Sequence, residues 1–369
     1  MNNQLISNQY KKEAVNLQNF DLEGSKSASW ESPSNIALIK YWGKHGDQLP
    51  QNPSISFNLK KSKTTTKIIY QTKEGAESKI KYLFENERNF LFEERVKGYF
   101  ETISVYLPFL KKLDFTIYSN NTFPHSAGIA SSASSFSALS HDLCSIEQEL
   151  FQTLTTRDEF YRKASFLARL GSGSATRSVP GKAVLWGETE LVKESSNEFA
   201  INMDNQVHHV FKSYRDAVLI IDSGQKATSS SKGHELMENH PFAKARYFQA
   251  NINLEKLLLA LKSGGEKIFT EIVENEALTL HAMMLSSNPS VSLIQPNTLL
   301  VIEKLKEFRQ KQQLNFAFTL DAGPNIHILY PYKIRNKMVY FIENELTQYC
   351  HKGKWIDDEI SDGPKHILT

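Results

Sequence analysis

The sequence predicts an α+β fold whose sheets are mostly antiparallel. Stretches with the two-residue alternation of strands are mixed along the chain with stretches that have helical spacing. They follow no strict βαβ rhythm, which is the pattern that predicts a parallel sheet. A chain of 369 residues is also too long for one ordinary core, so we expect two domains or one large α/β unit.

Breaks in composition suggest where these domains begin and end. Residues 1–25 are polar, rich in Asn and Gln, and end in a Gly-Ser-Lys-Ser cluster, so we expect a mobile or loosely packed extension. The polar segment KESSNEF marks a boundary within residues 190–210. We therefore expect a first domain over 26–205 and a second over 206–369.

Composition limits the classes of partner. Hydrophobic residues make up 40% of the chain, and 43 basic against 41 acidic residues leave a net charge of +2. Since no block of like charge occurs, we expect neither nucleic acid nor an anionic membrane as a partner. Cys144 and Cys350 form no C-x-x-C pair, the first 20 residues lack a signal-peptide core, and no run of 18 apolar residues occurs. We expect a cytoplasmic protein.

Individual elements follow from periodicity and turn residues. Alternating β-branched and aromatic residues predict strands at 64–72, 113–121, 183–186 and 216–222. Helical spacing predicts helices over 89–112, 241–261, 265–284 and 297–311, and one that follows the small-residue loop beginning at 123. Residues 314–331 predict a strand, a DAGPN turn and a second strand.

The segment NIALIKYWGK, residues 35–44, crowds two lysines and two aromatics together. A helical turn here would place Lys40 and Lys44 on one face and bury Ile36 to Ile39 on the other. A lysine buried beside Tyr41 and Trp42 is costly unless an anion completes the site. A surface amphipathic segment with exposed ammonium groups is the alternative.

The loop PHSAGIASSASS, residues 124–135, leads into a helix and has the chemistry of a phosphate site. Gly128 and Ala130 let the backbone approach a ligand closely, and Ser131 and Ser132 lie in the first helical turn. Free N–H groups and the dipole favour an anion there, and a serine hydroxyl can reach a phosphate-bound Mg²⁺. The alternative is a small-residue helix packed tightly on a sheet.

Two further segments contain candidate catalytic residues. In GSGSATRSVPGKA, residues 171–183, Arg177 is set among Ser172, Ser174 and other small residues, where it can bind a carboxylate or phosphate bidentately. The spacing excludes a P-loop, because Thr176 replaces its first glycine. Asp321 in TLDAGPN follows an apolar strand, a favoured place for a catalytic acid. A surface arginine and a structural turn aspartate are the alternatives.

The histidines of HELMENH do not predict a metal site. His234 and His240 are six residues apart, and the H-E-x-x-H motif requires four. We expect both to be ordinary surface or capping residues.

NIALIKYWGK, PxxAGxASSA, SGSAxRS and DAGPN occur in this order and resemble the diphosphomevalonate decarboxylase family, a branch of the GHMP kinases. The likeness extends over roughly residues 29–364, and NIALIKYWGK with DAGPN is specific to the decarboxylase branch. The resemblance implies a two-domain GHMP kinase fold, with a ribosomal-protein-S5-like N-terminal domain and a ferredoxin-like C-terminal domain. It also implies ATP-dependent conversion of mevalonate 5-diphosphate to isopentenyl diphosphate, ADP, phosphate and CO₂, with ATP and Mg²⁺ as cofactors. Homodimers are usual in this family.

The resemblance also implies roles for individual residues. Asp321 corresponds to the acid that faces the tertiary 3-hydroxyl, Lys40 to its paired lysine, and Arg177 to the arginine that binds the substrate carboxylate. The phosphate loop corresponds to Gly128, Ala130, Ser131 and Ser132, with Ser132 the expected Mg²⁺ contact. The positions that contact substrate or phosphate correspond to Asn35, Tyr41, Lys44, Ser172 and Ser174.

The chain departs from the family's pattern at Thr176, where cysteine is usual, at PHSAG, where PTAAG is commoner, and most seriously in one further segment. Bacterial relatives often have an arginine for the substrate diphosphate where this chain has SSSKGHEL, which offers Ser230, Ser231 and Lys232. Lysine neutralises phosphate only as a point charge. A phosphomevalonate decarboxylase and a mevalonate-type kinase therefore stay open as alternatives, and a non-catalytic binding protein is a third.

Overall fold

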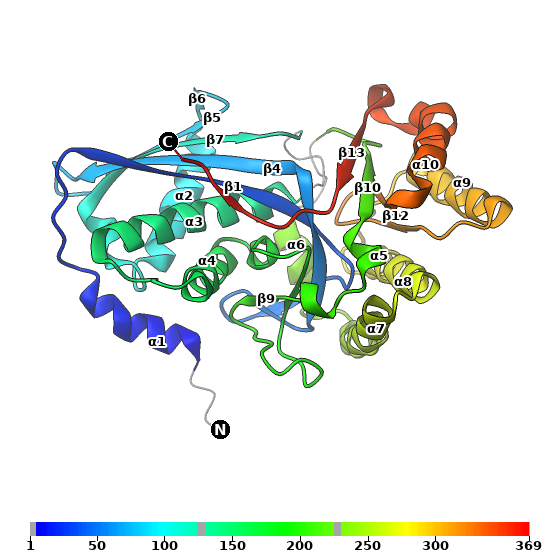
Figure 1. The fold of residues 1–369 in the computed structure, drawn as a ribbon, viewed down its shortest axis with the longest axis horizontal. Coiled ribbons are helices and arrows are strands. Elements are labelled where there is room, and N and C mark those ends of the chain that lie inside the picture. The colour runs from blue at the N-terminus through cyan, green and yellow to red at the C-terminus, as the bar shows by residue number, and fades with distance from the viewer. Residues whose placement is uncertain (1–4, 124–129, 225–229, 369) are drawn as a thin grey trace.

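A computed structural model describes residues 5–123, 130–224 and 230–368. The described strands form a large sheet, a smaller sheet and a short hairpin (Figure 1). The large sheet has the order β14-β1-β4-β7-β5-β6, with β8 pairing β4 and β9, and only β5 and β7 pair in parallel. The expected α+β fold with mostly antiparallel sheets is confirmed. The strands of the large sheet are β1 (Ser25–Ala37), β4 (Ser54–Thr72), β5 (Ile80–Phe84), β6 (Glu87–Arg88), β7 (Leu113–Asn121), β8 (Ala183–Trp186), β9 (Ala200–Asn202) and β14 (Lys365–His366).

Three helices cover the large sheet and form its core: α2 (Phe90–Ile103), α3 (Ser131–Phe151) and α4 (Arg157–Gly171). The predicted helix over 89–112 is too long. Asn89 begins α2 by accepting a hydrogen bond from the Phe92 N–H at 3.0 Å, and the helix ends at Ile103. A separate 3₁₀ helix, Pro108–Lys112, follows, since a proline ring cannot continue an α-helix.

The smaller sheet has the order β11-β12-β10-β13 and lies at the other end of the molecule (Figure 1). Helix α8 packs on β11, and α7 packs on α8. The predicted strands and helices of this part of the chain are confirmed to within a few residues. Its elements are α5 (His209–Lys212), β10 (Tyr214–Leu219), α6 (Ser230–Leu236), α7 (Ala243–Ser263), α8 (Glu266–Leu285), α9 (Pro296–Gln312), β11 (Ala317–Thr319), β12 (Ile326–Pro331), α10 (Arg335–Phe341) and β13 (Trp355–Glu359).

The N-terminal segment is more ordered than its composition suggests. Residues 6–13 form α1 (Ile6–Glu13), and Tyr10, Ala14 and Leu17 are buried. The Tyr10 ring lies edge-on to Phe166 of α4, with the ring centroids 5.1 Å apart. The prediction of a mobile or loosely packed extension is therefore wrong for this stretch, because sparse apolar residues suffice to dock a short helix.

The two sheets are joined where β4 bulges. The register of β1 against β4 shifts between Pro33 and Asn35, which leaves Leu59 to Ser62 of β4 outside the regular ladder. The carboxylate of Asp358, on β13 of the smaller sheet, accepts hydrogen bonds from the N–H groups of Lys60, Lys61 and Ser62 at 2.7–3.0 Å. Its side chain is fully buried. A single carboxylate thus satisfies the bulge of one sheet from a strand of the other.

Along the described residues, no helix is long and apolar enough to cross a bilayer.

The Asp358 contact predicts a large loss of stability on neutral substitution. Asp358→Asn replaces one acceptor oxygen by a donor that faces backbone N–H groups, so we expect the free energy of unfolding to fall by about 3 kcal/mol. Urea denaturation followed by circular dichroism measures it. Asp362→Asn is the matched control, since the Asp362 side chain is 87% exposed in its ion pair with Lys182 and such pairs contribute about 0–1 kcal/mol. Equal losses in the two variants would contradict the prediction.

Candidate active site

The site is centred on an ion pair between the two sheets. Lys40 follows β1, Asp321 follows β11, and the Lys40 Nζ lies 2.9 Å from Asp321 Oδ1. The lysine side chain is 1% exposed and the aspartate side chain 25%. Burial lowers the pKa of Lys40, and attraction to Asp321 offsets only part of this effect. The ammonium therefore depends on this carboxylate, which keeps an exposed side for a ligand.

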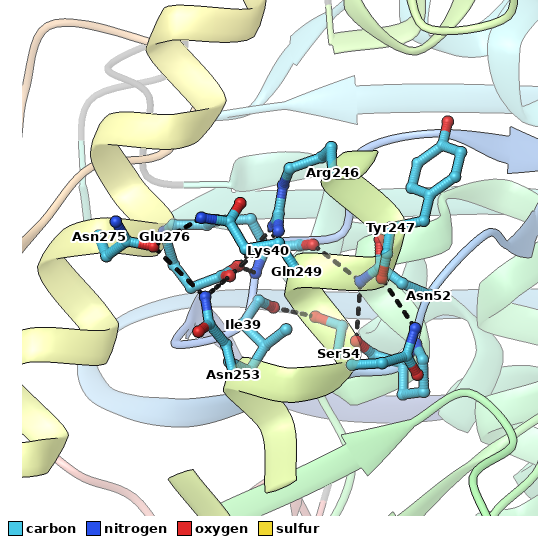
Figure 2. A network of polar contacts seen from close by, with 12 residues as sticks. Ile39, Lys40, Asn52, Ser54, Arg246, Tyr247, Gln249, Asn253, Asn275 and Glu276 are labelled. Carbon is cyan, nitrogen blue, oxygen red and sulfur yellow. Dashed lines mark hydrogen bonds and ion pairs between the residues drawn. The ribbon is translucent and has the colours of Figure 1, made fainter. Parts of the chain in front are cut away.

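A buried polar network holds the main chain of Lys40 in place (Figure 2). Glu276 of α8 accepts the Lys40 backbone N–H at 2.9 Å and forms a bidentate pair with Arg246 of α7. Asn253 donates a further hydrogen bond to Glu276 at 2.7 Å. On the other side, the Asn52 amide donates to the Lys40 carbonyl at 3.2 Å. Contacts to both backbone groups fix the position from which the lysine side chain extends.

Residues 35–44 adopt strand and irregular structure, so the helical turn considered for Lys40 and Lys44 is wrong. Strand β1 continues to Ala37, the Leu38 N–H donates to the Ile55 carbonyl at 2.8 Å, and Lys44 lies in β2 (Lys44–His45), which pairs with β3 (Leu49–Pro50). The backbone of β4 supplies the hydrogen-bond partners for this extended path. The spacing of residues along the sequence does not reveal such distant partners.

Arg177 is a buried cation at the end of a 3₁₀ helix, Gly173–Arg177. Its side chain packs over the Trp186 ring, 5.7 Å from the centroid, and within the described structure its Nε and Nη1 atoms have no hydrogen-bond partner. Burial lowers its pKa to about 10, against the attraction of Asp321. A buried guanidinium with free donors is suited to a carboxylate or phosphate ligand.

Three serine hydroxyls connect the start of α3 with the segment that leads to Arg177. Ser132 Oγ lies 3.3 Å from Ser172 Oγ, which lies 3.2 Å from Ser174 Oγ. Ser132 is in the first turn of a 21-residue helix, where free N–H groups attract anions. Hydroxyl oxygens at this position fit Mg²⁺, which prefers oxygen ligands. Ala130 precedes the helix in the left-handed region, and Gly128 lies outside the described residues.

Asn35 and Tyr41 present polar atoms beside these serines. The Asn35 amide donates to Ser178 Oγ at 2.9 Å and to the Ser174 carbonyl at 3.0 Å. Its carbonyl oxygen and the Tyr41 hydroxyl are buried with no partner among the residues described. A Cβ at Gly173 would lie 2.6 Å from that hydroxyl, so only glycine allows the tyrosine this close. Both atoms are available to a ligand.

The predicted phosphate-binding lysines lie in less constrained positions. Lys44 Nζ is 3.1 Å from Gln48 Oε1, and Lys232 Nζ is 3.1 Å from Glu235 Oε2 with its side chain 57% exposed. Ser230 and Ser231 begin α6, but their side chains lie outside the described part of the structure. Substrate contacts by these residues stay predictions.

The structure adds a histidine to this site that sequence reasoning placed on the surface. His234 is buried, accepts the Gly43 N–H at 3.0 Å, and packs against the rings of Tyr41 and Trp42. Burial and the nearby cations lower its pKa to about 3, so the ring is neutral. The surface assignment is wrong for His234, because α6 docks on residues 41–43. His240 is buried as well, and its Nδ1 accepts the Phe242 N–H at 3.2 Å just before α7. Among the described residues, no side-chain hydrogen bond caps that helix, so the expectation is wrong for both histidines.

A largely apolar pocket lies beside the first turn of α3. Arg95 stacks over the Phe136 ring at 5.0 Å within it, and burial lowers the pKa of Arg95. The pocket includes serines of the expected phosphate loop in its lining, and its aromatic side chains suit a heteroaromatic ring. It is lined by Thr66, Tyr82, Phe84, Phe92, Arg95, Val96, Ser131, Ser132, Ser135, Phe136 and Leu139.

The network around Lys40 predicts a specific loss on removing one charge. Glu276→Gln leaves the Arg246 guanidinium buried without its anion, so we expect the free energy of unfolding to fall by about 3–5 kcal/mol. Guanidinium chloride denaturation measures this loss. Glu235→Gln removes a carboxylate from an exposed pair with Lys232 and serves as control. An unchanged denaturation midpoint for Glu276→Gln would show that the buried pair does not stabilise this region.

Comparison with known proteins agrees with this geometry. The family model of the diphosphomevalonate decarboxylase-like N-terminal domain matches residues 32–198, and that of the mevalonate 5-diphosphate decarboxylase C-terminal domain matches residues 217–364. The diphosphomevalonate decarboxylase of Candida albicans is 28% identical over 326 residues, which cover 85% of this chain and 86% of the relative. That of Saccharomyces cerevisiae is 29% identical over 334 residues, covering 86% and 81%.

Solved structures show the same fold. Mevalonate diphosphate decarboxylase from Staphylococcus aureus superposes with a TM-score of 0.79 at 26% identity, covering 94% of this chain and 99% of that one. MDDEF in complex with MVAPP, AMPPCP and magnesium also gives a TM-score of 0.79, at 25% identity, covering 94% and 100%. The GHMP kinase fold expected from the sequence is confirmed. The chain belongs to the diphosphomevalonate decarboxylase family.

Proposed function

We propose that this protein converts mevalonate 5-diphosphate to isopentenyl diphosphate, with ATP consumed and ADP, phosphate and CO₂ released. The observation that supports this most is the arrangement of Lys40, Asp321 and Arg177. A partly exposed acid is paired to one buried cation, and a second buried cation has free donors. An alcohol and a carboxylate of one substrate can therefore be held at the same time. The family relationship supports the same reaction.

We assign ATP to the pocket beside α3 and its phosphates to the first turn of that helix. The aromatic walls suit the adenine ring, while Ser131, Ser132 and the helix N-terminus suit the phosphates. Ser132 would hold Mg²⁺ through its hydroxyl oxygen, and the bound ion would supply charge neutralisation at the phosphates. A similar protein, MDDEF, forms a complex with MVAPP, AMPPCP and magnesium, which supports binding of ATP and Mg²⁺ by this protein.

The first chemical step is phosphoryl transfer to the substrate 3-hydroxyl. An ordinary aspartate, with a pKa of about 3.9, cannot hold the proton of an alcohol whose pKa is near 15.7. The mismatch of roughly 12 units corresponds to about 16 kcal/mol. Asp321 therefore orients the hydroxyl and accepts its proton late, as a loose transition state allows.

The second step is loss of phosphate and CO₂. As phosphate departs from the tertiary carbon, positive charge builds up there, and the electrons of the carboxylate's bond to carbon form the new double bond. Arg177 orients the carboxylate through its free donors. Lys40 acts on the first step, where it keeps Asp321 ionised and oriented until the hydroxyl proton is transferred. The row of Ser132, Ser172 and Ser174 supports the phosphate that is transferred and then released.

CO₂ release from carboxyl-labelled substrate tests the proposed reaction. We expect release from mevalonate 5-diphosphate with Mg-ATP, together with ADP. Release from the 5-monophosphate alone would assign a phosphomevalonate decarboxylase, consistent with the exposed Lys232 replacing a diphosphate-binding arginine. ADP without CO₂ would indicate a kinase, and no substrate-dependent turnover would indicate a binding protein.

Substitution of Asp321 tests its role. Asp321→Asn retains the shape but cannot accept a proton, so we expect kcat to fall by about 10²–10⁴-fold. Steady-state ADP release measures it. Asp362→Asn, at an exposed aspartate, should retain wild-type turnover. Near-normal turnover by Asp321→Asn would refute the assignment.

Substitution of Arg177 separates the two steps. Arg177→Gln removes the cation that orients the carboxylate, so we expect CO₂ release to fall by about 10²–10³-fold. Single-turnover quenching measures ADP and CO₂ separately, and ADP formation should fall less than CO₂ release. A variant that releases CO₂ at the wild-type rate would exclude Arg177 from the reaction.

A cytoplasmic location and a homodimer are further proposals from the family relationship. Cell fractionation and analytical ultracentrifugation test them.

A further inference from the structure

A second buried ion pair lies in the smaller sheet, close to the first. His327 Nδ1 on β12 is 2.7 Å from Asp216 Oδ2 on β10, and both side chains are almost fully buried. In the β10–β12 ladder, His327 is opposite Val218, so Asp216 is its diagonal neighbour on the same face. The remaining Asp216 oxygen has no hydrogen-bond partner in the described ranges.

The register of β11 against β12 places the Asp216–His327 pair near Asp321. Thr319 of β11 is directly opposite His327 of β12, and Asp321 follows Thr319 by two residues. Residues two apart in extended chain lie on one face, so Asp321 continues the face that carries His327. Electrostatic interactions of His327 with both Asp321 and Lys40 agree with this placement. The Asp216–His327 pair thus lies close enough to the Lys40–Asp321 pair for their charges to interact.

The charge of His327 follows from its partner. Burial is the largest single influence and lowers its pKa, but the charge of Asp216, the hydrogen bond to Asp216 and attraction to Asp321 together raise the pKa above its ordinary value. The raised pKa favours the imidazolium, the form of the ring that attracts the Asp321 carboxylate. Burial raises the pKa of Asp216 as well, and attraction to His327 opposes this effect. Lys40 by itself favours the ionised form of Asp321 less strongly, because burial lowers the pKa of Lys40.

Binding of an anionic substrate calls for a second cation near Asp321, in addition to Lys40. The carboxylate and phosphates of the substrate approach Asp321 and disfavour its charged form, because like charges at short range favour protonation. A protonated Asp321 could no longer accept the hydroxyl proton. A fixed positive charge behind it counters this effect.

We propose that His327, held by Asp216, is a positioning residue whose imidazolium keeps Asp321 ionised and oriented when the anionic substrate binds. The proposal rests on the proposed function, because it assigns a task to Asp321 in that reaction.

Other charged groups around the Asp216–His327 pair also influence how activity depends on pH. Asp358 on β13 interacts with Asp216, and Arg177 interacts with Asp321. His281 on α8 interacts with Lys40 and Asp321, but burial lowers its pKa to about 4, so it stays neutral across the pH range of the test. Of these two histidines, His327 is therefore the one whose pKa is shifted in favour of the charged form.

Profiles of kcat/KM against pH for the full-length protein test the proposal. In His327→Gln we expect kcat/KM at neutral pH to fall about tenfold and the acidic limb to move up by about one pH unit. His327→Lys keeps the charge, so it should restore the acidic limb and extend activity at alkaline pH. His240→Gln removes a buried histidine that bonds to the Met283 carbonyl and should leave the profile unchanged. An acidic limb that does not move in His327→Gln would overturn the proposal.

A measurement without substrate separates this proposal from the proposed function. Histidine side-chain NMR of the full chain gives the pKa of His327, assigned with His327→Gln. Coupling between two charges is reciprocal, so Asp321→Asn should lower the pKa of His327. Asp321 is a quarter exposed, so this variant is expected to fold even if His327→Gln does not. An unchanged His327 titration overturns the proposal, whereas coupling without CO₂ release would overturn only the proposed reaction.

Discussion

The buried ammonium of Lys40 is the constraint on which the rest of the site depends. A lysine that is almost fully enclosed requires a nearby anion, and its anion, Asp321, follows a strand of the other sheet. The two sheets must therefore meet within the length of one ion pair. This requirement explains why contacts from residues 39–54 and from side chains of α7 and α8 converge around Lys40.

Rigid contacts between the sheets meet this requirement. Asp358 binds the bulge of β4 from β13, and Glu276 with Arg246 holds the main chain of Lys40 from the helices that cover the smaller sheet. Neither contact faces the substrate, yet both determine where the reacting groups lie. A displacement of about 1 Å at such a position is enough to reduce catalysis strongly.

The distribution of charge matches an anionic substrate. Arg177 retains free donors, the serine hydroxyls adjoin the positive end of α3, and the pocket beside that helix is mostly apolar. Lys40 and His327 both favour the ionised form of Asp321. The net charge of the whole chain is only +2, so recognition of the substrate depends on local placement of cations.

Periodicity and motifs were sufficient to predict the antiparallel α+β fold, the long helices α7 to α9, and the strand and turn that present Asp321. They also singled out Lys40 and Arg177, because a basic residue among apolar or small neighbours is visible locally. They did not predict the docking of α1, the irregular path of residues 38–43, or the burial of His234, Glu276 and His327. Those features depend on partners far away in sequence: periodicity reports that a face is buried, whereas only the folded chain decides which charge or ring it is buried against.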